Sequence, residues 1–321
     1  METYVLGADC GGTSSRVVVA TLDGRVAGRG RGGAGNPVAR DARAAAAELG
    51  AAAAQALAGL DPARVAGVVV GMAGRSRLAD PATAAAYDAV WAGLGVTCAV
   101  RAVGDAVVAY AAGTPEPSGS VLIAGTGAVG AAIEGWAVAR TADGLGWLLG
   151  DEGSGFWLGL SAARAAARAL YAGEAAGPLV AAVCAELGAT DPDALVSTVY
   201  AVPRDRISAL AAVVVATARA GDPEGLAILA DAADRLARTL VSLRPGPGPV
   251  VLAGGLLAGV PEIRDGVQAR LAALLGRPGV VGTDGAAAAA WLAGREIIGG
   301  DGAGLHASLL GREALSTRDE A

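Results

Sequence analysis

One short turn near the start of the chain combines a carboxylate with residue types that can hold a phosphate group. It follows the apolar residues 4–8 and consists of Asp9, Cys10 and then Gly11, Gly12, Thr13 and Ser14. Glycine lets backbone amides approach an anion closely, and the Thr13 hydroxyl adds a donor, so no lysine is needed. Asp9 could hold Mg²⁺ through water. The turn therefore predicts a phosphate and magnesium site, although an ordinary glycine-rich hairpin has the same pattern.

Two later glycine motifs follow apolar runs in the same way. Gly125-Thr126-Gly127 follows residues 120–124, and Gly254-Gly255 follows residues 250–253. A second phosphate turn on a facing lobe would complete a nucleotide clamp, and the glycine pair would let an adenosine lie flat against the backbone. The residues expected to bind ATP are Gly11, Gly12, Thr13, Ser14, Gly125, Thr126, Gly127, Gly254 and Gly255.

A single carboxylate, Asp105, is placed to act as a base. It follows a predicted strand over residues 97–103 and Gly104, and it precedes an alanine-rich run. This arrangement exposes a side chain at the carboxyl edge of a sheet, where ligands of α/β folds bind. In phosphoryl transfer the base chiefly orients the attacking hydroxyl, so one aspartate is enough. The sequence predicts Asp105 as the catalytic base, and a helix N-cap is the structural alternative.

The residues expected to contact a sugar lie in two loops. Asn36, the only asparagine of the chain, precedes Pro37; its amide could read two hydroxyls, or it could simply initiate a turn. Residues 144–155 hold five glycines, Trp147 and Asp151. A tryptophan can pack on a pyranose and a carboxylate can accept its hydroxyls, whereas the alternative is a structural loop with Trp147 in the core. The expected sugar-binding residues are Asn36, Asp105, Gly146, Trp147 and Asp151.

Composition excludes several other kinds of protein. The chain has no lysine, which a P-loop requires, and its net charge of -6 without a basic cluster argues against nucleic acid or an anionic membrane. The only histidine, His306, lies in a glycine-rich tail, where we expect a solvated or disordered residue. Three scattered cysteines (Cys10, Cys98 and Cys184) predict inert reduced thiols. No apolar run reaches the ~18 residues of a membrane span, so we expect a cytoplasmic protein.

Two similar halves would position these residues. Strands are expected over residues 4–28, 65–70 and 97–103, with helices over 41–58 and 81–94. After the linker 113–119, rich in proline and glycine, the order of strand, Gly-Thr turn and strand starts again. We therefore predict an α/β protein with an N-terminal lobe over residues 1–115. The second lobe, residues 116–321, would carry a helical insertion, and its tail 300–321 would be mobile or pack on the first lobe.

The order of the motifs resembles the N-acetylglucosamine kinases grouped with the BadF/BadG/BcrA/BcrD ATPase-like proteins, in the actin/hexokinase/Hsp70 superfamily. The resemblance covers residues 4–295, and the stretch Gly150-Asp151-Glu152-Gly153-Ser154 is its specific part. The matching positions are 9–13, 36, 104–105, 125–127, 147–155 and 253–255.

The resemblance implies a two-lobed actin-like ATPase fold of the ribonuclease H-like type, with duplicated βββαβα units and an ATP and sugar cleft between the lobes. Asp105 would activate the 6-hydroxyl of N-acetylglucosamine, ATP and Mg²⁺ would be the cofactors, and the protein would be a homodimer. Two departures stand out. Leu145 replaces a tryptophan of the animal enzymes, and Ala128-Val129 replace polar residues. The acceptor could therefore also be glucosamine or N-acetylmuramic acid.

Two other functions remain open on the same fold. An ATPase that activates a reductase or dehydratase through a shared iron–sulfur cluster needs paired cysteines, which this sequence does not show. A sugar sensor without kinase activity usually carries an added DNA-binding helix pair, for which residues 1–3 leave no space ahead of the first strand.

Overall fold

Two five-stranded sheets form the framework of the computed structural model, which describes residues 2–38, 41–173, 176–300 and 302–311. The strand orders are β3-β2-β1-β4-β5 and β10-β9-β6-β7-β8, so the second sheet repeats the first in the order of its strands. This confirms the predicted duplicated α/β fold. The strands are β1 (Tyr4–Cys10), β2 (Ser15–Thr21), β3 (Val26–Gly32), β4 (Val65–Met72), β5 (Val100–Gly104), β6 (Gly119–Ala124), β7 (Ala128–Glu134), β8 (Ala137–Asp143), β9 (Val250–Ala253) and β10 (Val280–Val281).

The internal contacts of the chain divide it into two units that are not continuous in sequence. Unit 1 contains the described residues up to Ser118, then Ile133–Ala139 and the described residues from Gly282 onward. Unit 2 contains Gly119–Ala132 and the described residues of Arg140–Val281. The division into lobes 1–115 and 116–321 stays a prediction. By their contacts, the described residues from Gly282 onward belong with unit 1.

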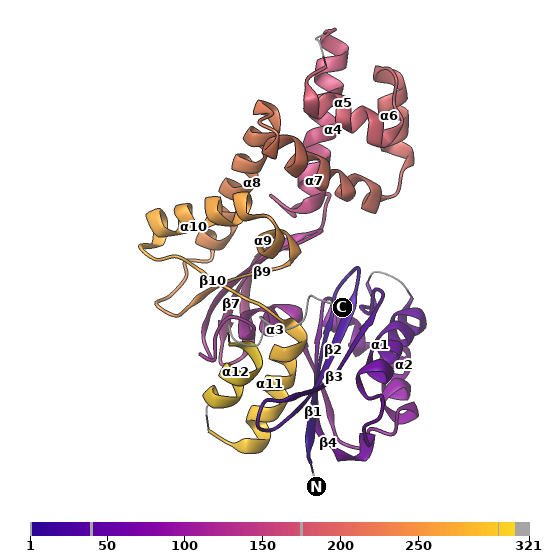
Figure 1. The fold of residues 1–321 in the computed structure, drawn as a ribbon, viewed down its shortest axis with the longest axis vertical. Coiled ribbons are helices and arrows are strands. Elements are labelled where there is room, and N and C mark those ends of the chain that lie inside the picture. Colours follow the sequence, from indigo (N-terminus) through magenta and orange to yellow (C-terminus); the bar gives the residue numbers. More distant parts are fainter. Residues whose placement is uncertain (1, 39–40, 174–175, 301, 312–321) are drawn as a thin grey trace. The chain divides into compact units, whose positions relative to one another are not determined.

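In unit 1, helices cover both faces of the first sheet (Figure 1). The central strand β1 runs antiparallel to β2 and parallel to β4, and nearly all of its residues are buried, as expected for a strand covered on both faces. One core packs the sheet against α1 and α2 through residues such as Leu49 and Trp91. The helices of this unit are α1 (Ala42–Ala56), η1 (Pro62–Arg64), η2 (Arg75–Ala79), α2 (Pro81–Gly93), α3 (Asp105–Ala111), α11 (Gly285–Ile298) and α12 (Ala303–Leu310).

Helix α11 lies directly on the backbone of β1. Its residues 286–290 are five alanines with no exposed surface. A Cβ atom on Gly7 of β1 would lie 2.0 Å from the amide nitrogen of Ala290 and 2.2 Å from the carbonyl oxygen of Ala286. The two backbones can approach this closely only because neither element presents a larger side chain at the contact.

The C-terminal helix α12 corrects the expectation for His306. This residue is part-buried, its Nε2 lies 2.8 Å from the carbonyl oxygen of Ala111, and its ring packs edge-on against Trp291 at 4.9 Å. Trp291 also contacts Trp136, over which the Arg295 guanidinium lies at 4.9 Å. Burial lowers the pKa of His306. The prediction of a solvated or disordered histidine is therefore wrong, because an aromatic cluster encloses it.

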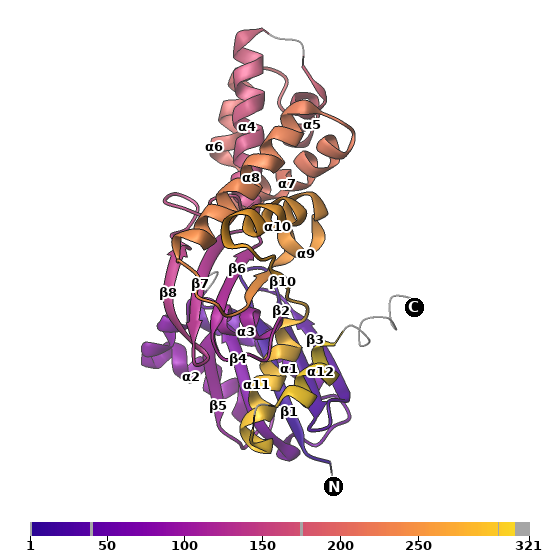
Figure 2. The ribbon, with the colours of Figure 1, turned by 90° about the vertical axis from the view of Figure 1, so that its left-hand side faces the viewer.

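Unit 2 places a helical group beyond the ends of β6, β7 and β8 (Figure 2). Ser154 caps α4 by accepting the Trp157 amide, and Asp222 caps α8 by accepting the Gly225 amide. The core of the unit packs Leu122 and Leu252 of the sheet against α4, α7, α8 and α10. The helices are α4 (Gly155–Ala172), α5 (Pro178–Leu187), α6 (Pro192–Ala201), α7 (Arg204–Arg219), α8 (Pro223–Ser242), α9 (Gly255–Gly259) and α10 (Pro261–Leu275). Among the described helices, none combines the length and apolar character needed to cross a bilayer.

The contact between α11 and β1 makes a testable prediction for stability. Gly7→Ala should destabilise unit 1 by about 3 kcal/mol or more, because the added methyl meets backbone atoms that cannot rotate away. Chemical denaturation followed by circular dichroism measures the change in unfolding free energy. Gly93→Ala is the matched control, since a Cβ there meets no atom within 4 Å. Equal effects of the two substitutions would contradict the close contact.

Candidate functional site

The first glycine turn is closed and presents two residues to solvent. The amide of Gly11 donates to the carbonyl oxygen of Ser14 at 2.9 Å, while Gly12 and Thr13 are exposed. Because the hydrogen bond fixes the turn, the amides between its ends are held in place on the surface. This is the form that an anion-binding turn requires.

Asp9 lies beside this turn, at the start of α11. Its Oδ2 is 2.6 Å from the point where a Cβ on Gly285 would stand, so the carboxylate is packed against the first residue of that helix. Burial raises the pKa of Asp9 to about 6, and the negative charges of Asp105 and Asp284 add to the rise, against Arg16, which lowers it. Three carboxylates thus share one electrostatic environment.

Asp284 is a residue of this group that sequence reasoning missed. It caps α11 by accepting the Ala287 amide at 3.1 Å, and its other oxygen pairs with Arg29 at 2.6 Å. The signal in the sequence was an aspartate just before a glycine and alanine run, which reads only as a helix start. Its proximity to Asp9 comes from packing of segments far apart in the chain.

Asp105 is the first residue of α3 and follows the last strand of the first sheet. Its N-cap is Gly104, so the carboxylate is not used as the helix cap that the sequence left open. Its Oδ1 accepts the Ala106 amide at 3.0 Å, and burial raises its pKa. In the described parts of the chain this carboxylate has no ion-pair partner, so its second oxygen can accept a ligand hydroxyl.

Asn36 is buried next to the first turn. Its Oδ1 accepts the Val38 amide at 3.1 Å, which is the turn role left open by the sequence. Its Nδ2 is 3.7 Å from the position of a Cβ on Gly12. Asn36 and the first glycine turn are therefore neighbours, and contact with a sugar stays a prediction.

The second glycine turn is fastened to the start of α4. The Gly125 amide donates to the Gly127 carbonyl at 2.9 Å, and the carbonyls of Gly125 and Thr126 accept the amides of Gly155 and Phe156. The first amides of α4 are thus used to fix the turn. Thr126 itself is exposed.

The glycine pair after β9 adjoins this second turn. Gly254 has φ +94°, and a Cβ there would stand 2.3 Å from the carbonyl oxygen of Ala124. The Gly255 amide nitrogen is 3.9 Å from the position of a Cβ on Gly125. Unit 2 therefore brings together the two glycine motifs that were expected to bind the same nucleotide.

Asp151 points to the second turn. Its Oδ1 accepts the Ala128 amide at 3.0 Å, and its carboxylate fills the space beside Gly127. Burial raises its pKa. Asp143 in turn accepts the amides of Asp151 at 2.7 Å and Glu152 at 2.8 Å. The predicted sugar loop is thereby tied to the predicted phosphate turn, and sequence reasoning missed Asp143 because its role depends on tertiary contact.

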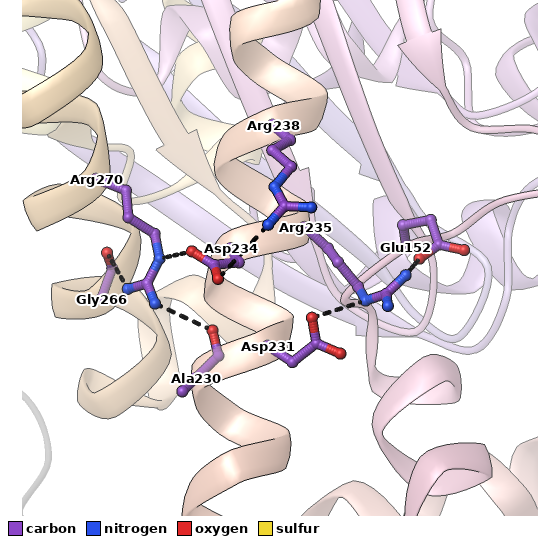
Figure 3. Close-up of polar contacts among 8 residues, drawn as sticks. All are labelled: Glu152, Ala230, Asp231, Asp234, Arg235, Arg238, Gly266 and Arg270. Carbon is purple, nitrogen blue, oxygen red and sulfur yellow. Dashed lines mark hydrogen bonds and ion pairs between the residues drawn. The ribbon is translucent and has the colours of Figure 1, made fainter.

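Arg235 of α8 holds the other side of the same loop. Its guanidinium pairs with Glu152 and, at 3.1 Å, with Asp231, and it lies 4.8 Å from the ring centre of Trp157 (Figure 3). A second arginine, Arg270, joins α10 to α8 nearby (Figure 3). The loop is thus anchored at both of its carboxylates.

Trp147 is not a core residue. Its side chain is 41% exposed, and its ring is tilted against Phe156 at 5.3 Å. It lines a cavity of about 640 Å³ between α4 and α8. Gly146, beside it, has φ +83° and accepts the Gly150 amide at 2.8 Å, which shapes the loop.

The cysteines and possible metal clusters complete the description. Cys10, Cys98 and Cys184 are free thiols, and burial raises the pKa of Cys10 to about 12. No group of three or more histidine, cysteine or acidic residues suited to a metal occurs in the parts of the chain that the structure describes. Each unit therefore contributes its own group of predicted residues: Asp9, the first turn, Asn36 and Asp105 in unit 1, and the second turn, Asp151, Gly254 and Gly255 in unit 2.

Comparison with known proteins identifies the family of the chain. The model of the BadF/BadG/BcrA/BcrD ATPase family matches residues 6–289. The chain belongs to this family. Its fold is the actin-like ATPase fold, and no curated protein sequence matches the chain at a significant level.

Three solved structures are similar to this family member. A candidate N-acetylglucosamine kinase from Chromobacterium violaceum is 27% identical, with a TM-score of 0.70 over 91% of this chain and 99% of that one. Another candidate N-acetylglucosamine kinase, from Porphyromonas gingivalis, is 21% identical, with a TM-score of 0.71 over 95% and 98%. A ROK family glucokinase from Streptomyces griseus, solved with glucose and AMPPNP, is 21% identical, with a TM-score of 0.61 over 90% and 99%.

The raised pKa of Asp9 predicts how the stability of this member of the BadF/BadG/BcrA/BcrD ATPase family depends on pH. In the unfolded chain the carboxyl ionises near pH 3.9, and in the folded chain it ionises at about 6. Between these values the unfolded state binds fewer protons, so stability falls as pH rises, and the loss is complete above pH ~6. Asp9→Asn should therefore raise the thermal midpoint relative to wild type at pH 8 and change it less at pH 5.

Differential scanning fluorimetry without added metal tests this difference. Asp41→Asn is the control, because asparagine caps α1 as well as aspartate does. If Asp9→Asn raised the thermal midpoint equally at both pH values, the pKa of Asp9 would not be raised by burial and by the neighbouring carboxylates.

The Asp143 carboxylate predicts the mobility of the loop over residues 144–153. Asp143→Ala removes the acceptor of two backbone amides, so amide hydrogen exchange in this loop should speed up about tenfold, which corresponds to the loss of roughly 1.4 kcal/mol of local protection. Asp143→Asn keeps one acceptor oxygen and should have a smaller effect. Unchanged exchange in both variants would mean that other contacts hold the loop.

Proposed function

We propose that this protein is an ATP-dependent amino-sugar kinase that transfers the γ-phosphoryl group to the 6-hydroxyl of N-acetylglucosamine. The Chromobacterium violaceum candidate kinase supports this, since it aligns over nearly the full length of both chains at 27% identity. The family also contains ATPases that are not kinases, so the choice between a kinase and such an ATPase depends on the geometry of the site.

The observation that carries the proposal is the placement of Asp105. It stands at the end of β5 with one oxygen engaged by a backbone amide, and it is close enough to Asp9 for their charges to interact. A base that orients an acceptor hydroxyl needs such a carboxylate beside the phosphate-binding residues. An ATPase that activates water alone does not need Asn36 and an aromatic loop in addition.

ATP would be bound by the residues of the two glycine turns. The amides and hydroxyls of residues 11–14 and 125–127 would hold the phosphates, and Gly254 and Gly255 would receive the adenosine. Each turn is fixed by hydrogen bonds of its own, so the turns would lose little conformational entropy when ATP binds.

Asp9 is the residue of unit 1 that would hold Mg²⁺. Asp9 offers the oxygen donor that this hard cation prefers, and the repulsion of Asp9 by Asp105 and Asp284 is the kind that a divalent cation offsets. When bound through water at Asp9, the ion would neutralise charge on the transferring phosphates. Asp9 would hold the ion, while Asp105 would keep its role toward the sugar.

The sugar would be held by Asn36, Asp105, Gly146, Trp147 and Asp151. Asp151 already accepts the Ala128 amide, so only its remaining oxygen would be available for a hydroxyl. Leu145 is exposed and provides no aromatic face. Glucosamine and N-acetylmuramic acid are therefore the alternative acceptors.

In the proposed reaction the 6-oxygen of the sugar forms a bond with the γ-phosphorus as the bond to the β–γ bridging oxygen breaks. The hydroxyl proton passes to Asp105, and ADP leaves with the electron pair of the broken bond. The raised pKa of Asp105, caused by burial, makes it a better proton acceptor than a solvated aspartate. Exclusion of water would limit the competing hydrolysis of ATP.

We further propose that the kinase works in the cytoplasm, where ATP is available, and that it is a homodimer. The dimer is supported by apolar side chains that unit 2 leaves exposed.

The Asp105 assignment predicts a loss of turnover without a loss of ATP binding. Asp105→Asn should lower kcat for sugar phosphorylation by about 10²–10⁴-fold, while ATP affinity changes little. Coupled ADP release with Mg-ATP measures this on N-acetylglucosamine, glucosamine, N-acetylmuramic acid and glucose. Asp88→Asn, on the exposed face of α2, is the control.

The same assay separates the alternatives. ADP release that is equally fast with and without each sugar would favour the ATPase function. No ADP release at all, together with sugar binding in calorimetry, would favour a sugar sensor.

A further inference from the structure

A free arginine stands at the start of α7 in unit 2. Arg204 is the first residue of this helix, it is exposed, and it forms no ion pair with any described residue. Arg206, two residues further on, pairs with Glu186 at 3.7 Å and donates to the Glu186 carbonyl oxygen at 3.2 Å. An exposed arginine is ordinary by itself, so its surroundings decide whether it can act on a ligand.

The beginning of α7 packs against the beginning of α4. A Cβ on Gly159 would stand 1.8 Å from the Ile207 carbonyl oxygen, so the two helices meet backbone to backbone. A Cβ on Gly155 would stand 3.4 Å from the Oγ atom of Ser208. The amide of this same Gly155 fastens the second glycine turn by donating to the Gly125 carbonyl oxygen at 2.8 Å. The first residues of α7 therefore lie beside the second glycine turn.

The charge of Arg204 also acts on Asp151, which belongs to the same part of unit 2. Burial raises the pKa of Asp151, and the positive charge of Arg204 lowers it in part. The Asp151 carboxylate accepts the Ala128 amide at 3.0 Å and occupies the space beside Gly127. No ion pair joins Arg204 to Asp151, so the guanidinium is near the second glycine turn and is still able to bind a ligand.

From this placement we propose that Arg204 binds the γ-phosphate of ATP at the second glycine turn and stabilises the charge on that group during its transfer. The inference deepens the proposed function and rests on it, because it takes this turn as a phosphate site. Asp151 is proposed to face the sugar, so a cation beside Asp151 lies where the γ-phosphate meets the acceptor. A guanidinium can offer two parallel N–H donors to one phosphate group.

A phosphate at this turn needs a positive charge that the turn itself does not provide. The donors of the turn are backbone amides and the Thr126 hydroxyl, all of them neutral, and the chain has no lysine. In phosphoryl transfer, cations that face the phosphoryl oxygens lower the energy of the transition state. Arg235, which contacts the neighbouring loop, is already paired with Glu152 and Asp231. Arg204 has no such partner among the described residues and is available to the nucleotide.

The sugar is a poorer partner for Arg204 than the nucleotide is. N-acetylglucosamine carries no charge, whereas the γ-phosphate is anionic, so only the phosphate compensates the desolvation of a guanidinium. Glucosamine carries an ammonium group, which Arg204 would repel. N-acetylmuramic acid carries a carboxylate, so the turnover of this sugar has to be compared with that of N-acetylglucosamine.

Calorimetric titration of the full chain with Mg-ADP and with the analogue Mg-AMPPNP tests the assignment. Because ADP lacks the γ-phosphate, Arg204→Gln should weaken AMPPNP binding about tenfold and change ADP binding by less than about twofold. Arg204→Lys keeps the charge and should recover part of the lost affinity. Arg206→Gln is the matched control near the start of the same helix, since Arg206 pairs with Glu186, and it should change neither affinity.

Turnover gives an independent measurement of the same role. Arg204→Gln should lower kcat for ADP release with N-acetylglucosamine about 10²–10³-fold, with little change in the KM of the sugar. If N-acetylmuramic acid is also phosphorylated, its turnover should fall by the same factor.

Equal losses of ADP and AMPPNP affinity, no loss of either, or a loss of turnover confined to N-acetylmuramic acid would overturn the inference. If Arg204→Gln fails to fold by circular dichroism, Arg204→Lys decides by the same comparison of the two nucleotides. A protein that needs Arg204 for AMPPNP but releases no ADP in response to any sugar would support the inference and refute the kinase. Sugar-dependent ADP release that Arg204→Gln leaves unchanged would do the opposite.

Discussion

The close approach of α11 to β1 is the constraint on which the arrangement of unit 1 depends. Gly7 offers no side chain, and the facing residues of α11 are alanines, so helix and strand meet backbone to backbone. This contact brings the start of α11, with Asp284 and Gly285, to the end of β1, where Asp9 stands. The electrostatic environment of Asp9 is therefore a result of packing between segments almost 280 residues apart. A larger residue at position 7 would move the helix and separate the carboxylates.

Unit 2 fixes its own residues by a different means, a chain of carboxylate contacts. Asp143 holds the amides of the glycine-rich loop, Asp151 of that loop holds the second turn, and Arg235 holds Glu152. Acidic side chains here organise backbone, because a carboxylate can accept several amides at once. Burial raises the pKa of Asp151, and the hydrogen bond from the Ala128 amide counteracts part of that rise. The unit thus couples its aromatic loop to its glycine turn, residues 125–127, without a lysine.

Much of the fold could be predicted from the sequence, because local patterns of apolar residues and glycines indicate the strands and turns of both sheets. Glycines directly after apolar runs indicate both glycine turns, and the restart after the linker indicates the second sheet. The roles of Asp284 and the cluster around Trp136 could not be predicted, since they depend on partners distant in the chain. The role of Asp143 depends on how an irregular glycine-rich loop folds back to it, which no repeating pattern of residues indicates. His306 was wrongly expected in solvent for the same reason. A glycine-rich tail looks exposed unless the aromatic residues that bury its histidine are known in advance. The direction of Asp151, toward Ala128, was likewise invisible in its sequence neighbours.

Because unit 1 is discontinuous in sequence, the two units become complete at different times during synthesis. Strand β1 leaves the ribosome first, but the helix that covers it comes almost 280 residues later, which is roughly 15–55 s at ordinary rates of synthesis. Unit 2 is almost continuous and has all its strands and helices before α11 emerges. During that interval the face of the first sheet that α11 will cover is contacted only by α3 among the helices already made. Synthesis therefore passes through a stage at which unit 2 can already be native while part of the first sheet is still uncovered, until α11 closes it.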